Sequence, residues 1–125
     1  MIKQLLLVGL GGGIGSIFRY LTSLLVNKSF HSIHFPLATF IVNILGCLLI
    51  GILIGLSFKY ELWDRELKLL LITGFCGGYT TFSTFSSENF QLLESQHYLT
   101  LFTYIILSML IGILAVWLGF LITKL

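Results

Sequence analysis

Long stretches without a charged side chain decide what this sequence can fold into. Residues 37–58 and 98–123 contain none, and residues 4–27 contain only Arg19. A helix that crosses the hydrocarbon core of a membrane needs about 20 mostly apolar residues, so each stretch is long enough. Charged residues make up 10% of the chain, against about 25% in soluble domains. This composition excludes a soluble globular domain and indicates an integral membrane protein.

Four predicted helices account for nearly the whole chain. An open sheet leaves its edges unpaired in lipid, and the sequence lacks the alternating segments of about ten residues that build membrane barrels. We therefore predict an all-α membrane protein with a single membrane domain over residues 1–125. No room remains for a catalytic module, so we expect no enzyme activity, and the formal net charge of +2 is too small to suggest nucleic-acid binding. The predicted helices cover 4–27, 37–58, 67–93 and 98–123.

The third predicted helix has an unusual middle, which reads GFCGGYTTFSTFSSENF from Gly74 to Phe90. Glycine weakens a helix by about 1 kcal/mol relative to alanine, and Gly77 and Gly78 are adjacent. Non-helical backbone at membrane depth persists only where protein, a polar cavity or an ion satisfies it. We predict a break in this helix near residues 76–80, with its backbone groups satisfied by something other than lipid.

Polar and aromatic side chains repeat at helical spacing inside the predicted membrane segments. Such a row of hydroxyl and amide donors beside two phenyl rings, whose edges are positive, suits a small anion that has lost its water. Weak binding at several points favours passage over trapping. The alternative for each hydroxyl is a hydrogen bond to a carbonyl of its own helix. The alternative for the two rings is ordinary core packing, and their spacing alone favours that interpretation. The pairs are Thr39 with Asn43, Tyr104 with Ser108, and Phe82 with Phe85.

Two charged residues lie within the predicted spans. For Arg19 three roles are open: an anchor that extends to the interface, an ion-pair partner of Glu88, or a cation that concentrates anions in an aqueous vestibule. Glu88 is either that partner or a helix-end residue near water. Outside the spans, the three histidines lie in connections without ligand spacing, so we expect them to be solvated; they are His31, His34 and His97.

Small residues four apart predict close helix contacts, because they let backbones approach in lipid. The glycines of the first helix do not match a nucleotide-binding fingerprint. Cys47 and Cys76 lie in apolar stretches without metal-type spacing, so we assign them to packing. The small-residue pairs are Gly9–Gly13, Gly11–Gly15, Gly12–Ser16, Gly51–Gly55 and Ala115–Gly119.

Three segments of the chain resemble the Fluc/CrcB family of fluoride channels. They are GGGIGSIFRY (11–20), ATFIVNILG (38–46) and GFCGGYTTFSTFSSE (74–88), and the resemblance covers essentially the whole length. It implies a passive, fluoride-selective channel that exports cytoplasmic fluoride down its electrochemical gradient and so reduces fluoride toxicity. It also implies a multi-pass protein of a prokaryotic plasma membrane, with fluoride and membrane lipid as partners.

The resemblance further implies an antiparallel dimer with two pores and a structural sodium ion at the interface. The sodium ligands it implies are the backbone carbonyls of Gly77 and Thr80. The resemblance also implies a structural role for the charge of Glu88. The chain departs from some relatives at Gly112, where they carry a further hydroxyl. The fluoride pathway implied by the resemblance comprises Asn43, Phe82, Phe85, Ser83, Thr84, Tyr104, Ser108 and Arg19.

The distribution of basic residues leaves the partner in the dimer open. Five basic residues are predicted on the side of the membrane where the termini lie, against Lys28 on the other side. Under the positive-inside rule, this difference favours cytoplasmic termini. A dual-topology homodimer should show little bias, so the second subunit is either a second copy or an oppositely oriented paralogue. The five are Lys3, Lys59, Arg65, Lys68 and Lys124.

Two other functional classes fit a chain of four helices. A small proton-coupled multidrug exporter needs a carboxylate in its first helix, where this chain has only Arg19. A structural or holin-like protein needs no glycine- and hydroxyl-rich segment at the bilayer midplane. The sequence therefore favours the channel over both.

Overall fold

The computed structural model describes residues 1–31, 34–60 and 63–125, and every regular element within these ranges is helical. Three long helices are apolar enough to cross a membrane: α1 (Ile2–Ser29), α2 (Leu37–Lys59) and α6 (Tyr98–Ile122). A fourth run is bent and built from shorter pieces. These are α3 (Arg65–Lys68), the π-helix η1 (Leu69–Cys76), α4 (Gly77–Tyr79) and α5 (Phe82–Glu94).

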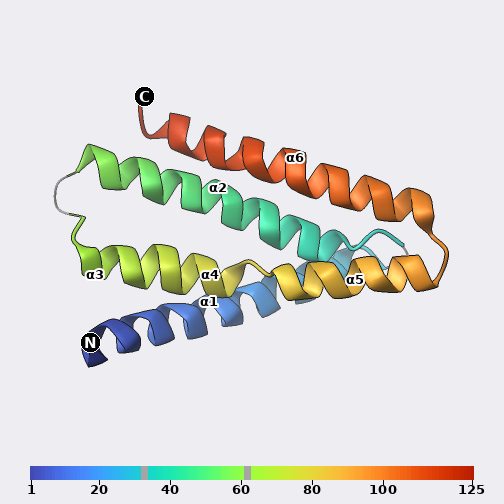
Figure 1. The fold of residues 1–125 in the computed structure, drawn as a ribbon, viewed down its shortest axis with the longest axis horizontal. Helices are drawn as coiled ribbons and strands as arrows, with labels where there is room; N and C mark the ends of the chain where they lie inside the picture. Colours follow the sequence, from blue (N-terminus) through green and yellow to red (C-terminus); the bar gives the residue numbers. More distant parts are fainter. Residues whose placement is uncertain (32–33, 61–62) are drawn as a thin grey trace.

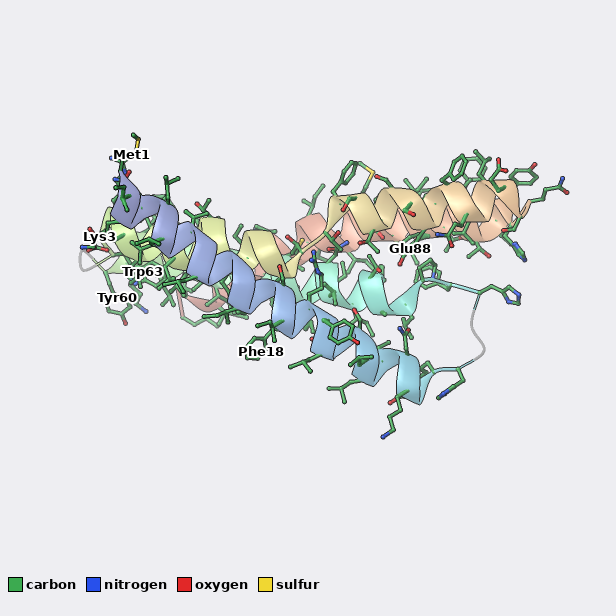
Figure 2. The ribbon with its side chains drawn as sticks, turned by 90° about the horizontal axis from the view of Figure 1, so that it is seen from below. Met1, Lys3, Phe18, Tyr60, Trp63 and Glu88 are labelled. Atoms are coloured by element: carbon green, nitrogen blue, oxygen red, sulfur yellow. The ribbon has the colours of Figure 1, made fainter. Side chains whose placement is uncertain are left out.

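The four runs lie roughly lengthwise beside one another (Figure 1). Helix α2 packs along α6, and α1 packs along η1 and α4. Both termini lie at the end of the molecule where α2 connects to α3. Figure 2 shows Lys3, Tyr60 and Trp63 gathered at that end, with Glu88 in the opposite half. An ion pair of 2.7 Å between Lys3 Nζ and Glu66 Oε2 ties α1 to α3 there.

Glycines set the close approach of both helix pairs, because a side chain would collide with the neighbouring backbone. A Cβ atom on Gly11 or Gly15 would overlap the carbonyl oxygen of Leu70 or Phe75, respectively. On the other side, a Cβ atom on Gly51 would overlap the Val116 carbonyl oxygen. The predicted close contacts at Gly11–Gly15 are therefore present. Those at Gly9 and Gly13 are not, since both face open space within the described chain.

We expect Gly15→Ala to destabilise the protein by about 1–3 kcal/mol, the usual cost of overpacking. The added methyl group must push α1 away from the Phe75 carbonyl. Gly13→Ala, on the same helix but with open space around it, is the matched control and should be neutral or slightly stabilising. Thermal unfolding in detergent measures both, and equal melting temperatures for the two variants would contradict the packing assigned to Gly15.

The fourth run is interrupted at Thr80 and Thr81, whose backbones are extended with φ/ψ of −79°/156° and −146°/122°. The interruption overlaps the predicted interval 76–80 at its last residue, and Gly77 and Gly78 remain helical. The π-helical segment before the glycines was not predicted. Segments of this kind are rare and occur often near functional sites.

Candidate functional site

Asn43 of α2 satisfies the backbone at the interruption. Its Nδ2 donates to the Thr81 carbonyl at 3.1 Å, and its Oδ1 accepts from the Thr81 amide at 2.8 Å. One side chain therefore takes the place of a strand or helix partner for both backbone groups of Thr81. The predicted requirement, that the interrupted backbone be satisfied by something other than lipid, is met here by an amide from the neighbouring helix.

Thr81 also starts the second half of the broken run. Its hydroxyl oxygen accepts the Thr84 amide at 3.2 Å, which caps the first turn of α5. The same hydroxyl contacts those of Ser83 and Thr84, at 3.4 Å and 3.0 Å. The amino end of α5, with its partial positive charge, thus opens at the interruption among three hydroxyls.

Glu88 is held by two hydroxyls from neighbouring helices. Thr39 Oγ1 donates to Glu88 Oε1 at 2.6 Å, and the buried Tyr104 donates to Oε2 at 2.8 Å. Arg19 lies elsewhere, with its Nη1 3.4 Å from the Thr80 carbonyl. The structure therefore does not show the ion pair with Glu88 that was one of the three roles open for Arg19. Arg19 instead connects α1 to the interruption.

We expect Tyr104→Phe to destabilise the protein by about 1.5–3 kcal/mol, the usual worth of a hydrogen bond to a charged group. The change removes only the hydroxyl that binds Glu88 Oε2, because the ring stays in its packing. Tyr98→Phe is the control, since Tyr98 is exposed. Chemical unfolding in detergent compares the two. A loss no larger than that of Tyr98→Phe would contradict the role given to this bond.

The two phenyl rings of α5 lie together, with centroids 5.9 Å apart. Phe85 also packs against Tyr104 at 5.0 Å, beside buried Leu92 and Leu101. Phe82 differs, because 78% of its surface is exposed. Core packing, the simpler interpretation of the pair, therefore accounts for Phe85 and leaves Phe82 without a structural role inside one copy of the chain.

An open cavity of about 590 Å³ brings most of the predicted site residues together. At its wall the Ser108 hydroxyl is buried and has no hydrogen-bond partner within the described part of the chain. A buried donor without a partner is costly, so this hydroxyl is available to a ligand. Among the residues that line the cavity are Asn43, Gly77, Thr80, Phe82, Phe85 and Ser108.

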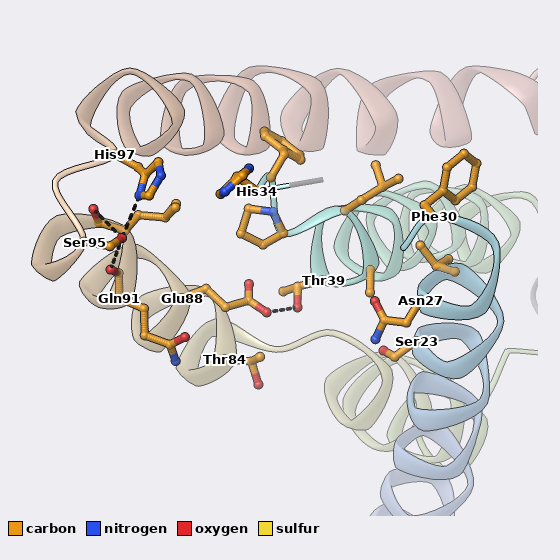
Figure 3. A pocket seen from close by; sticks show the side chains of 16 residues that line it. Ser23, Asn27, Phe30, His34, Thr39, Thr84, Glu88, Gln91, Ser95 and His97 are labelled. Carbon is orange, nitrogen blue, oxygen red and sulfur yellow. Dashed lines mark hydrogen bonds between the residues drawn. The ribbon is translucent and has the colours of Figure 1, made fainter. Parts of the chain in front are cut away.

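The remaining predicted residues border two other cavities or lie behind them. Thr84 and Glu88 line a cavity of about 570 Å³ near the connection before α2 (Figure 3). Arg19 and Thr84 line a smaller one of about 210 Å³. The Ser83 hydroxyl contacts the Thr81 hydroxyl at the interruption. The Tyr104 hydroxyl donates to Glu88, which lines the larger of these two cavities. Thr39, which lines both of these cavities, was noted as a polar residue but not predicted as part of the site.

A family model described as "CrcB-like protein, Camphor Resistance (CrcB)" matches residues 6–120. The chain belongs to the CrcB family. The predicted family is therefore confirmed.

Relatives in the CrcB family match this chain over nearly its whole length. Proteins named "Fluoride-specific ion channel FluC" are 52% identical in Azobacteroides pseudotrichonymphae, over 99% of this chain and 98% of the relative, and 51% identical in Flavobacterium psychrophilum, over 98% of each. A third relative, from Ignicoccus hospitalis, carries the same name and is 44% identical over 94% of this chain and 93% of its own.

Proposed function

We propose that this chain is a passive, fluoride-selective channel that exports cytoplasmic fluoride. The relatives named as fluoride-specific ion channels support this function. The observation that carries it is the cavity at the interruption, where Asn43, the phenyl rings and the Ser108 hydroxyl, unpartnered within the described residues, surround the same space. A channel moves its ion chemically unchanged, so the function is transport and not enzyme catalysis.

The chemistry of this cavity suits fluoride. Hydroxyl and amide protons and the positive ring edges replace the water that a small anion loses, and the amino end of α5 adds partial positive charge. No lysine or arginine is among the residues lining this cavity in the described chain, so the anion is held weakly enough to leave. We place Ser83 and Thr84 at the α5 end of this path and Arg19 in the vestibule beside it.

The driving force needs no energy source other than the membrane potential. Hydrogen fluoride is a weak acid that crosses membranes in its neutral form and dissociates inside, where fluoride is then trapped. An inside-negative potential expels an anion through an open path with about 2.3 kcal/mol per 100 mV. We therefore propose that the protein lies in a plasma membrane, from which expelled fluoride reaches the exterior.

We also propose a structural sodium ion at the carbonyls of Gly77 and Thr80. The Gly77 carbonyl fits such an ion. In a continuous helix the Thr81 amide would bond the Gly77 carbonyl, but it bonds Asn43 instead. The Gly77 carbonyl is thereby released at an exposed position that borders the cavity. A freed carbonyl at the carboxyl end of a half-helix suits a sodium ion. The Thr80 carbonyl, which lies 3.4 Å from Arg19 Nη1, would exchange that contact for the ion.

If the ion is structural, we expect replacement of sodium by an organic cation to abolish most fluoride flux. No sodium should move with the fluoride, because the ion holds the backbone and is not carried. Flux from proteoliposomes after exhaustive sodium removal, together with radioactive sodium uptake, measures both effects. Sodium transport, or full activity without sodium, would rule out this role.

We propose that four membrane spans per chain assemble as an antiparallel dimer. Within one copy, α5 leaves Phe82, Ser83, Ser86 and Ser87 exposed. Hydroxyls at membrane depth are costly to leave against acyl chains, so a second copy or an oppositely oriented paralogue is expected to cover them. A second copy with dual topology is the simpler arrangement.

Reconstituted liposomes test the proposed function against its rivals. Vesicles are loaded with fluoride or chloride, and a potassium gradient with an ionophore clamps the potential. Rapid fluoride efflux with negligible chloride efflux is the expected result. Proton-coupled movement of organic cations would instead identify an exporter, and the absence of any selective flux would identify a structural protein.

A further inference from the structure

Two histidines that lie 63 positions apart in the sequence meet at the edge of the cavity that contains Glu88. The imidazole rings of His34 and His97 are stacked, with centroids 5.0 Å apart and planes at 28°. Both side chains are exposed and line the cavity (Figure 3). Sequence spacing gave no sign of this pair, because His34 precedes α2 and His97 precedes α6.

The hydrogen bonds of Ser95 fix the proton on the His97 ring. The Ser95 hydroxyl donates its only hydrogen to the Gln91 carbonyl at 2.7 Å. Its oxygen therefore accepts from His97 Nδ1, which lies 2.9 Å away. Nδ1 then carries the proton, and Nε2 is left with a free lone pair. A hydrogen bond on one ring nitrogen that leaves the other free is the usual arrangement of a metal-binding histidine.

We infer that His34 and His97 form a binding site for a divalent transition-metal ion of the zinc, copper or nickel type. Imidazole suits these metals, whereas magnesium and calcium prefer oxygen ligands. With His97 held by Ser95, rotation of the exposed His34 side chain is the movement needed to place one of its nitrogens and His97 Nε2 at the ~2.0–2.1 Å of a zinc–imidazole bond.

The surrounding charges are compatible with a bound cation. The Glu88 carboxylate lines the same cavity, and the carboxyl end of α5 carries partial negative charge beside Ser95. The amino end of α6, which begins at Tyr98, opposes a cation and partly offsets this. No group of three histidine, cysteine or acidic side chains suited to a metal occurs among the described residues. The proposed site therefore has two protein ligands, and we expect water in the remaining positions.

Isothermal titration with zinc chloride tests the site in detergent-solubilised full-length protein, from which any polyhistidine tag has been removed. We expect His34→Ala and His97→Ala each to weaken zinc binding at least tenfold, and the double variant to lose no more than either single one. Ser95→Ala should weaken it about tenfold, since partners behind metal-binding histidines contribute about 10–100-fold. His31→Ala, a change at the exposed histidine of the same connection, is the matched control and should bind like the unmodified protein.

Circular dichroism and gel-filtration profiles establish that each variant is folded. Zinc affinity that is unchanged in both His34→Ala and His97→Ala would overturn the site. Equal loss in His31→Ala would also overturn it, because the metal would then use a different set of ligands. Saturable zinc binding that depends on His34 and His97 but not on His31 supports it.

Discussion

Phe82→Ile lowers fluoride flux by roughly two- to tenfold and leaves the fold of each single copy nearly as stable. The flux estimate follows from the value of aromatic interactions, about 0.5–1.5 kcal/mol, at about 1.4 kcal/mol per factor of ten. The stability estimate follows from exposure, because 78% of the Phe82 surface lies outside the core of one copy. Isoleucine keeps an apolar side chain at the cavity but removes the positive ring edge. Fluoride efflux from proteoliposomes and thermal unfolding measure the two quantities.

Two further variants separate the ring chemistry from packing. Phe90→Ile on the same helix is the control, because Phe90 is exposed but does not line the cavity, and it should conduct normally. Phe85→Ile should lower flux as Phe82→Ile does, and it should also destabilise, since Phe85 packs on Tyr104. Unchanged flux in both Phe82→Ile and Phe85→Ile would reduce the pair to packing and would remove the rings from the proposed path.

Asn43→Leu should cause the largest loss of activity. The change keeps the branched shape and the number of side-chain heavy atoms but removes both hydrogen bonds to Thr81. Each backbone group left unsatisfied costs about 1–3 kcal/mol. If about 3 kcal/mol of this loss falls on the conducting conformation, flux falls about 100-fold. Initial efflux rates, normalised to the amount of folded protein, measure the effect.

Asn89→Ala is the matched control for Asn43. Its Nδ2 bonds the Phe85 carbonyl of its own helix, which is already part of the helical ladder. Flux should therefore change little in this variant. An Asn43→Leu protein that conducts like Asn89→Ala would show that the interruption does not depend on the amide from α2.

The all-helical fold could be predicted because its cause is local. Uncharged runs long enough to cross the hydrocarbon core of a bilayer indicate membrane helices. The glycine spacing within residues 11–15 predicts close contact of the first helix with a neighbouring helix. The structure shows which neighbour it is, since Gly11 faces Leu70 of η1. Spacing within one helix cannot supply that information, because it depends on how two distant segments meet.

The site could be predicted only in part for the same reason. Thr39 and Asn43 were expected to share a face, but their partners, Glu88 and Thr81, lie on the broken run 38 or more positions away. The π-helix has no distinctive local sequence signal, so residues 69–76 were expected to be ordinary helix. The interruption lies at Thr81 because its hydroxyl caps the helix that follows. A hydroxyl residue before a new helix is a better signal for the position of the break than the preceding glycines.

We propose that fluoride crosses passively and selectively through this protein. The reversal potential of the current in a planar bilayer, with a tenfold fluoride gradient and equal pH on both sides, tests it most directly. A passive fluoride path predicts reversal at about 59 mV, the value for a monovalent ion, with no shift when a pH gradient or a chloride gradient is added. Reversal that follows protons or chloride would contradict the claim.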